Sequence, residues 1–128
     1  MPLGAVSIAT AKDVTASDIF KAASLTQAAG TGSTAFNGLV TLTNKFDFTG
    51  NNLSINGAGT NGVGTTMDVT NAGLFTTANG ANLSVGNEFI QDGAGANSIG
   101  GNIASVNDGI AFLKGVTLTN GVLCRSAR

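Results

Sequence analysis

The sequence predicts an all-β fold in which short strands stack along one axis as a β-solenoid. Three observations lead to this prediction. Apolar and polar residues alternate with a period of two in segments such as LVTLTN and KFDFTG, which is the pattern of a strand. Segments rich in Gly and Asn, such as GAGTNGVG and DGAGAN, separate the strands, and these residues allow tight corners. The third observation is that the chain resembles itself at long range.

The internal similarity appears at two neighbouring offsets. The aligned pairs are Gly30 with Gly93, Phe36 with Ile99 and Val40 with Ile103 (103 minus 40 is 63), and Leu25 with Phe89, Gln27 with Gln91 and Phe48 with Phe112 (112 minus 48 is 64). The word VTLTN also occurs twice, at 40–44 and 116–120, which is a distance of 76 (116 minus 40). No single offset fits all of these matches, so we infer a smaller unit that recurs imperfectly. Such short strands bury enough apolar area only by stacking on similar neighbours.

Composition limits both the interior and the partners. The chain of 128 residues has 42% hydrophobic residues but no Trp or Tyr, which predicts a thin core of small aliphatic side chains. Only 10% of the residues are charged and the net charge is -1, so the chain offers little to nucleic acid or to an anionic membrane surface. No apolar segment approaches the length that a membrane span requires, about 18 residues at the least, and we expect no membrane insertion.

The segment 17–29, SDIFKAASLTQAA, is the one stretch with helical character. Ser17 or Asp18 would cap a helix there, but the same residues also fit two strands, DIFKA and SLTQA, and the repeats favour strands. We assign residues 1–123 to a single β-solenoid repeat domain. Residues 124–128 break the pattern and are expected to be a non-repeat tail of unrelated, frame-derived or vector-derived sequence.

An antiparallel β-sandwich or barrel is the alternative fold. Its support comes from Asn-Gly pairs, the strongest short hairpin signal. They begin at Asn37, Asn56, Asn61, Asn79 and Asn120.

Catalytic residues are scarce. The chain has no His and a single Cys, Cys124, which excludes triads built on imidazole and metal sites of the Cys/His kind; no cofactor is expected.

Glu88 and Asp92 are the best acidic pair, because a corner between them would bring two carboxylates to one edge, as a sugar-cleaving or metal site requires. The alternative is that both are solvated corner residues. Asp108 is a candidate metal ligand or, otherwise, a turn residue.

Two further patterns have a structural and a functional interpretation. Phe46 and Phe48 share one side of a strand, so they fill the core or form an exposed stacking platform. Thr-x-Thr occurs at 41–43 and 117–119 and places two hydroxyls about 7 Å apart on one face; two such pairs are too few for an ice-binding array.

One motif occurs twice in the chain. It consists of an apolar-Thr-Gln strand, a Gly-rich corner, Thr-x-Phe-x-Gly and then an apolar-Thr strand. It is carried by Leu25, Thr26, Gln27, Gly30, Gly32, Thr34, Phe36, Gly38 and Val40, and again by Phe89, Gln91, Gly93, Gly95, Ile99, Gly101 and Ile103. The two segments resemble the repeats of large bacterial surface proteins related to filamentous haemagglutinin and to autotransporter passenger domains. The resemblance spans roughly residues 5–123. It implies a right-handed parallel β-helix that is secreted and displayed at the cell surface as a stalk or adhesin.

We therefore expect a structural or adhesive repeat segment of a secreted or cell-surface bacterial protein, without catalysis. Expected partners are a host or polysaccharide surface and further copies of the chain, which would associate through exposed terminal coils. The alternative function is a carbohydrate-active or carbohydrate-binding β-helix module that uses Glu88 and Asp92.

Overall fold

A computed structural model describes residues 3–126, which form strands and no helix. The strands are β1 (Leu3–Ile8), β2 (Val14–Ala16), β3 (Phe20–Gln27), β4 (Ser33–Phe36), β5 (Val40–Leu42), β6 (Phe46–Gly50), β7 (Asn52–Ile55), β8 (Gly59–Val63), β9 (Met67–Asn71), β10 (Phe75–Thr77), β11 (Ala81–Val85), β12 (Phe89–Gln91), β13 (Asn97–Ile99), β14 (Ile103–Ser105), β15 (Ile110–Phe112), β16 (Val116–Leu118) and β17 (Cys124–Ser126).

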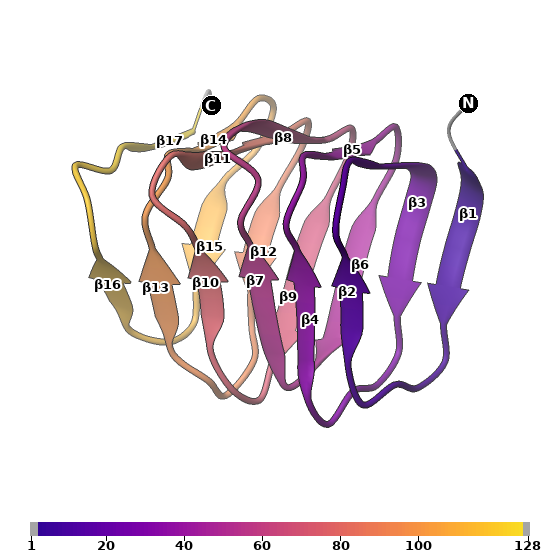
Figure 1. The fold of residues 1–128 in the computed structure, drawn as a ribbon. Coiled ribbons are helices and arrows are strands. Elements are labelled where there is room, and N and C mark those ends of the chain that lie inside the picture. Colours follow the sequence, from indigo (N-terminus) through magenta and orange to yellow (C-terminus); the bar gives the residue numbers. More distant parts are fainter. Residues whose placement is uncertain (1–2, 127–128) are drawn as a thin grey trace.

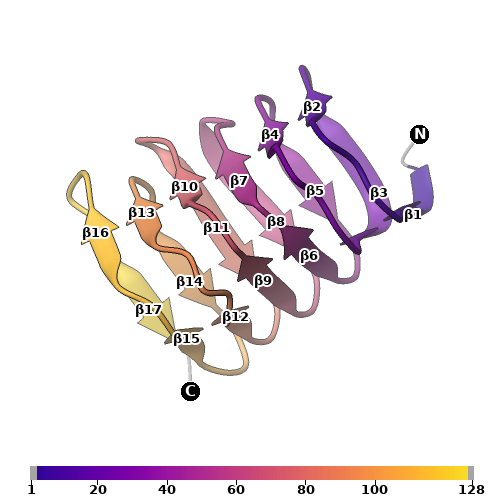
Figure 2. The same ribbon diagram turned by 90° about the horizontal axis from the view of Figure 1, so that it is seen from below.

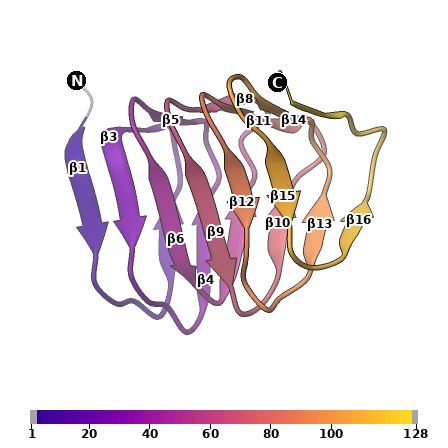
Figure 3. The ribbon, with the colours of Figure 1, turned by 180° about the vertical axis from the view of Figure 1, so that it is seen from behind.

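The chain winds into a parallel β-solenoid of about six coils with three faces (Figures 1 and 2). The β7 face consists of β2, β4, β7, β10, β13 and β16, which form one sheet. The second sheet bends at β3 into two faces. One is the β6 face, with β1, the last part of β3, β6, β9, β12 and β15 side by side (Figure 3); the other is the β5 face, with β5, β8, β11, β14 and β17. β1 and β16 lie at opposite ends of the stack.

Consecutive coils pair in parallel, so that equivalent positions recur once in every coil. Phe46 pairs with Met67 (67 minus 46 is 21). Each strand therefore lies above a chemically similar strand of the next coil, which confirms the predicted all-β solenoid fold. The three-coil distance explains the offsets seen in the sequence. Leu25 leads through Phe46 and Met67 to Phe89 (89 minus 25 is 64).

The antiparallel sandwich or barrel is wrong, because every strand pairing among residues 3–126 for which a register is defined is parallel. The Asn-Gly pairs do not form hairpins. Asn61 and Gly62 lie inside β8, and Gly80, with a φ of 79°, makes the corner between β10 on the β7 face and β11 on the β5 face. A solenoid corner and a hairpin turn both need small residues that tolerate a positive φ. The Asn-Gly pairs therefore could not distinguish a parallel solenoid from antiparallel hairpins.

The segment 17–29 forms no helix. β3 is a single strand of eight residues that crosses a corner of the solenoid. Its first part, Phe20–Ala22, pairs with β5, and its last part, Leu25–Gln27, pairs with β6. The two expected strands are therefore one continuous strand that contributes to two faces.

The solenoid also extends beyond the predicted domain boundary at residue 123. β17 pairs in parallel with β14, and Cys124 lies opposite Ile103. Residues 124–126 thus belong to the β5 face, although their composition differs from that of the repeats. The last two residues of the predicted tail lie outside the described residues.

The core is a set of columns made by inward side chains of successive coils. Phe46 and Phe48 are 1% and 0% exposed, which confirms that they fill the core and do not form a platform. The rings of Phe75 and Phe89 stack with centroids 6.0 Å apart. Burial of each large apolar side chain contributes about 1.5–3 kcal/mol, so these columns stabilise the stack along its axis.

Polar side chains inside the solenoid bond to one another or to corner carbonyls. Thr34 Oγ1 donates to Gln27 Oε1 at 2.8 Å. Asn61 accepts from the Val40 amide at 2.9 Å and donates to the Gly57 carbonyl at 3.1 Å. Because buried polar groups are costly when unpaired, these bonds give the interior a defined register.

Candidate functional site

Acidic side chains gather on the outside of the β6 face. Asp47 on β6 and Asp68 on β9 are direct register partners. Both alternate with buried apolar neighbours, so their carboxyl groups project outward from the sheet. The sequence analysis did not single out this pair, although the two positions lie one coil apart (68 minus 47 is 21).

The predicted pair Glu88 and Asp92 lies on the same face, one coil further. The two residues flank β12, so a strand separates them where a corner had been considered. Four residues of extended strand span about 13 Å. Asp92 accepts a hydrogen bond from Thr70 Oγ1 at 2.7 Å, which holds its carboxylate over the end of β9.

Asp68 interacts electrostatically with each of the other three acidic residues of this face. Burial raises the pKa of the Asp68 carboxyl, and the negative charges of Asp92 and Asp47, a hydrogen bond with the Asp92 carboxyl and the charge of Glu88 raise it further. Within residues 3–126, its Oδ1 is buried and has no hydrogen-bond partner. Asp68 therefore retains a proton at a higher pH than an ordinary aspartate and can act as a hydrogen-bond donor over that range.

Neither metal binding nor an enclosed reaction site follows from this arrangement. In the described chain, no group of three or more metal-ligating side chains is placed to hold an ion. A shallow hollow of about 380 Å³ lies beside the acidic residues, at the corner between the β6 and β7 faces. Its lining consists of Ala29, Gly30, Thr49, Gly50, Thr70, Asn71, Ala72, Gly93 and Ala94. The four carboxylates therefore lie outside this hollow.

Asp108 lies in the corner between β14 and β15. Its Oδ1 accepts a hydrogen bond from the Gly109 amide at 2.8 Å, and its backbone carbonyl accepts one from Ser126 Oγ at 2.6 Å. Both are hydrogen bonds of a corner residue, and neither involves an acidic residue of the β6 face.

The β7 face differs from the β6 face, because the central column of its outward side chains carries no charge. This column is rich in hydroxyl groups and follows the strand register through Thr15, Ala35, Ser54, Thr76, Ser98 and Thr117. Adjacent members are separated by the strand spacing of about 4.8 Å. Thr-x-Thr pairs did not reveal this column, because Thr41 lies on β5 and Thr117 on β16, which belong to different faces.

Asn side chains at two corners hydrogen-bond to Asn side chains of the neighbouring coil. Asn56 donates to Asn37 at 3.0 Å, and Asn107 donates to Asn87 at 3.2 Å.

Among residues 3–126, no helix has the length and apolar character required to cross a membrane. Comparison of the chain with protein-family models, with curated proteins and with solved structures gave no match.

Proposed function

We propose that the chain is a structural and adhesive segment of a secreted or cell-surface bacterial protein, and that it performs no catalysis. The observation that supports this proposal is the continuous interior. Side chains from all three faces fill the axis of the solenoid: Leu53 of the β7 face, Met67 of the β6 face and Val85 of the β5 face are each 0% exposed. A molecule of this kind is a rigid rod whose useful surfaces are its lateral faces.

The β7 face is the adhesive surface that we favour. From Ser54 to Thr117 its central column offers hydroxyls at a regular spacing of about 4.8 Å, without charges that would have to be desolvated on contact. Hydroxyl groups both donate and accept hydrogen bonds, so this column suits an uncharged, hydroxyl-rich partner such as a polysaccharide surface.

Binding of the purified protein to immobilised polysaccharides and to cell surfaces tests this proposal. Thr76→Lys places a charge in the middle of the column and should weaken binding by about tenfold, equivalent to about 1.4 kcal/mol. Ser84→Lys places the same charge on the β5 face and should leave binding unchanged. Equal effects of the two substitutions, or no binding to any surface tested, would count against the β7 face.

A carbohydrate-active module using Glu88 and Asp92 is the second candidate. The proximity of both carboxylates to Asp68, whose pKa they raise, favours it, since a protonated carboxyl beside an ionised one is the acid-base pair of glycoside hydrolysis. A panel of polysaccharides decides between the candidates. Hydrolysis that is lost in Glu88→Gln and Asp92→Asn would support the enzyme, whereas a panel without turnover supports the structural role.

A further inference from the structure

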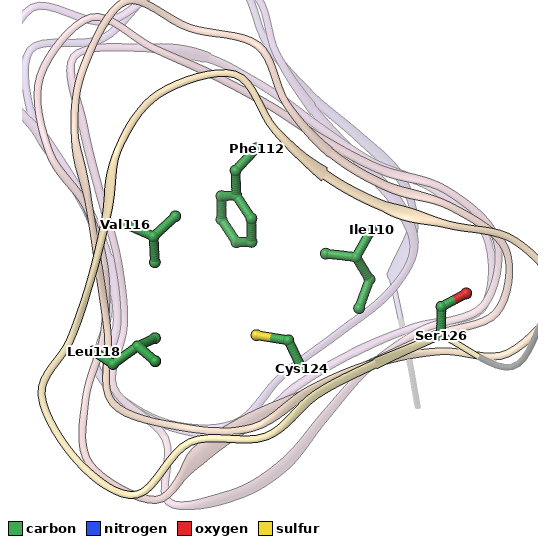
Figure 4. Close-up of a pocket in the computed structure, with 6 residues that line it drawn as sticks. All are labelled: Ile110, Phe112, Val116, Leu118, Cys124 and Ser126. Carbon is green, nitrogen blue, oxygen red and sulfur yellow. The ribbon is translucent and has the colours of Figure 1, made fainter.

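The last described coil, which contains β15, β16 and β17, leaves an open section through the core. A hollow of about 480 Å³ lies there, lined by Ile110, Phe112, Val116, Leu118, Cys124 and Ser126. Figure 4 shows the first five of these side chains pointing into the ring formed by the last coil. Val116 and Leu118 are 38% and 54% exposed, whereas Ile99, which precedes Leu118 in its column, is 0% exposed.

The N-terminal end exposes the same columns from the other side. Leu3 is 56% exposed, and Val6 and Ile8 of β1 and Ala16 of β2 are partly buried against the core cluster. Val14 is likewise only partly buried. No inward side chain of the described strands at this end carries a charge.

The two ends match because the same columns of inward side chains terminate at both. Val6 heads the column that runs through Leu25 and ends at Ile110. Val14 heads the column that ends at Val116. The register gives five matched pairs, with the C-terminal residue first: Ile110 with Val6, Phe112 with Ile8, Val116 with Val14, Leu118 with Ala16 and Ser126 with Leu3.

We propose that a second copy of this chain stacks on the first head to tail, with its N-terminal coil on the C-terminal coil. Strand β15 then pairs with β1 of the next copy and β16 pairs with β2, in the parallel register that joins all consecutive coils of the protein. The junction continues an interface that the molecule already forms between its own coils. Each outer strand edge gains backbone partners, and each terminal column becomes buried.

The direction of stacking follows from the direction of the chain. If two C-terminal ends met, the chain would run around the axis in opposite senses in the two copies. Only one face could then lie over its equivalent, and pairing there would be antiparallel. Head-to-tail contact is the one arrangement that keeps all three faces aligned and all pairing parallel. Such a contact does not close on itself, so it generates open filaments.

Lysine substitutions at each end provide the test, which does not depend on the adhesive role. Leu118→Lys places a charge in the open C-terminal section, and Val14→Lys does the same at the N-terminal section. The controls are the outward neighbours on the same strands, Thr117→Lys and Thr15→Lys. Circular dichroism and thermal unfolding establish that each variant is folded, and sedimentation velocity over a hundredfold range of concentration measures assembly.

We expect the unsubstituted chain and both controls to form longer species as the concentration rises. Each inward variant alone should remain a monomer. An equimolar mixture of Leu118→Lys and Val14→Lys should form a dimer and nothing larger, because the mixture contains one intact N-terminal end and one intact C-terminal end that fit each other.

Labelling of Cys124 by a maleimide provides a second measurement. Its rate should fall with concentration in the unsubstituted chain and stay constant in Val14→Lys. The proposal is overturned if the unsubstituted chain is monomeric throughout, or if either inward variant dimerises by itself, since that would mean that like ends associate.

Discussion

Gln91 donates a hydrogen bond from Nε2 to Oδ1 of Asn71, at 2.8 Å, in the interior between two neighbouring coils. Gln91 Oε1 accepts the Lys114 amide of the following coil at 3.2 Å. Asn71 Nδ2 also donates to the Gly73 carbonyl at 2.9 Å. Two amide side chains thus connect three coils through bonds that no apolar pair would replace.

Removal of this bond should destabilise the protein. Asn71→Ala removes the Oδ1 acceptor of the Gln91 side chain and the Nδ2 donor to the Gly73 carbonyl, and the loss of such buried hydrogen bonds costs about 1–3 kcal/mol. We expect the midpoint of denaturant unfolding to fall accordingly. Asn44→Ala is the matched control, because Asn44 is exposed and such substitutions change stability by less than about 0.5 kcal/mol. Equal midpoints for the two variants would show that the internal amides contribute nothing specific.

Loss of an aromatic ring from a central column should be more damaging than loss from a terminal one. Phe75→Ala opens a cavity against Phe89 in a fully buried position and should cost about 3–5 kcal/mol. Phe112→Ala removes a phenyl ring from a partly buried position in the last coil, so the loss of stability should be clearly smaller. Thermal unfolding of both variants measures the difference, and a cost for Phe112→Ala equal to that for Phe75→Ala would contradict it.

Glycine is required where two corners touch. A Cβ at Gly95 would overlap the Gly73 carbonyl of the preceding coil, so Gly95→Ala should force the coils apart and lower the melting temperature. Gly62→Ala is the control, because its Cβ would meet nothing within 4 Å. Restriction of the unfolded chain should make this control neutral or stabilise it by about 0.4–1 kcal/mol. A Gly95→Ala protein as stable as Gly62→Ala would show that the corners have room to adjust.

Asp68 should make the stability depend on pH. Because the folded state raises the pKa of Asp68 above its ordinary value of 3.8, folding favours the protonated carboxyl. This contribution is complete below that ordinary value and is lost as the pH rises through the folded pKa. Asp68→Asn should therefore melt at a higher temperature than the unsubstituted chain at neutral pH, and this difference should shrink below the ordinary pKa.

Asp47→Asn provides the matching control for this titration. It removes one of the charges that raise the pKa of Asp68, so the loss of stability with rising pH should be smaller than in the unsubstituted chain. Melting temperatures recorded from pH 3 to pH 8 for the three proteins measure both effects. A pH profile for Asp68→Asn that parallels the unsubstituted profile would rule out the assignment to Asp68.

The sequence predicted the part of this structure that depends on short stretches of chain. Alternating segments such as KFDFTG form strands, and Phe46 and Phe48 fill the core as expected, because the side to which a strand residue points is decided by its immediate neighbours. The stacked architecture also followed, since strands of this length are stable only on similar neighbours.

The tertiary structure alone decided which strand lies over which. Coil lengths vary, because corners absorb insertions that strands cannot: Thr34 and Leu53 are one coil apart (53 minus 34 is 19), and so are Leu53 and Phe75 (75 minus 53 is 22). The two VTLTN words consequently lie on different faces. The same freedom at the corners brings Asp47, Asp68 and Asp92 together and aligns the two open ends, and no pattern within a single strand contains that information.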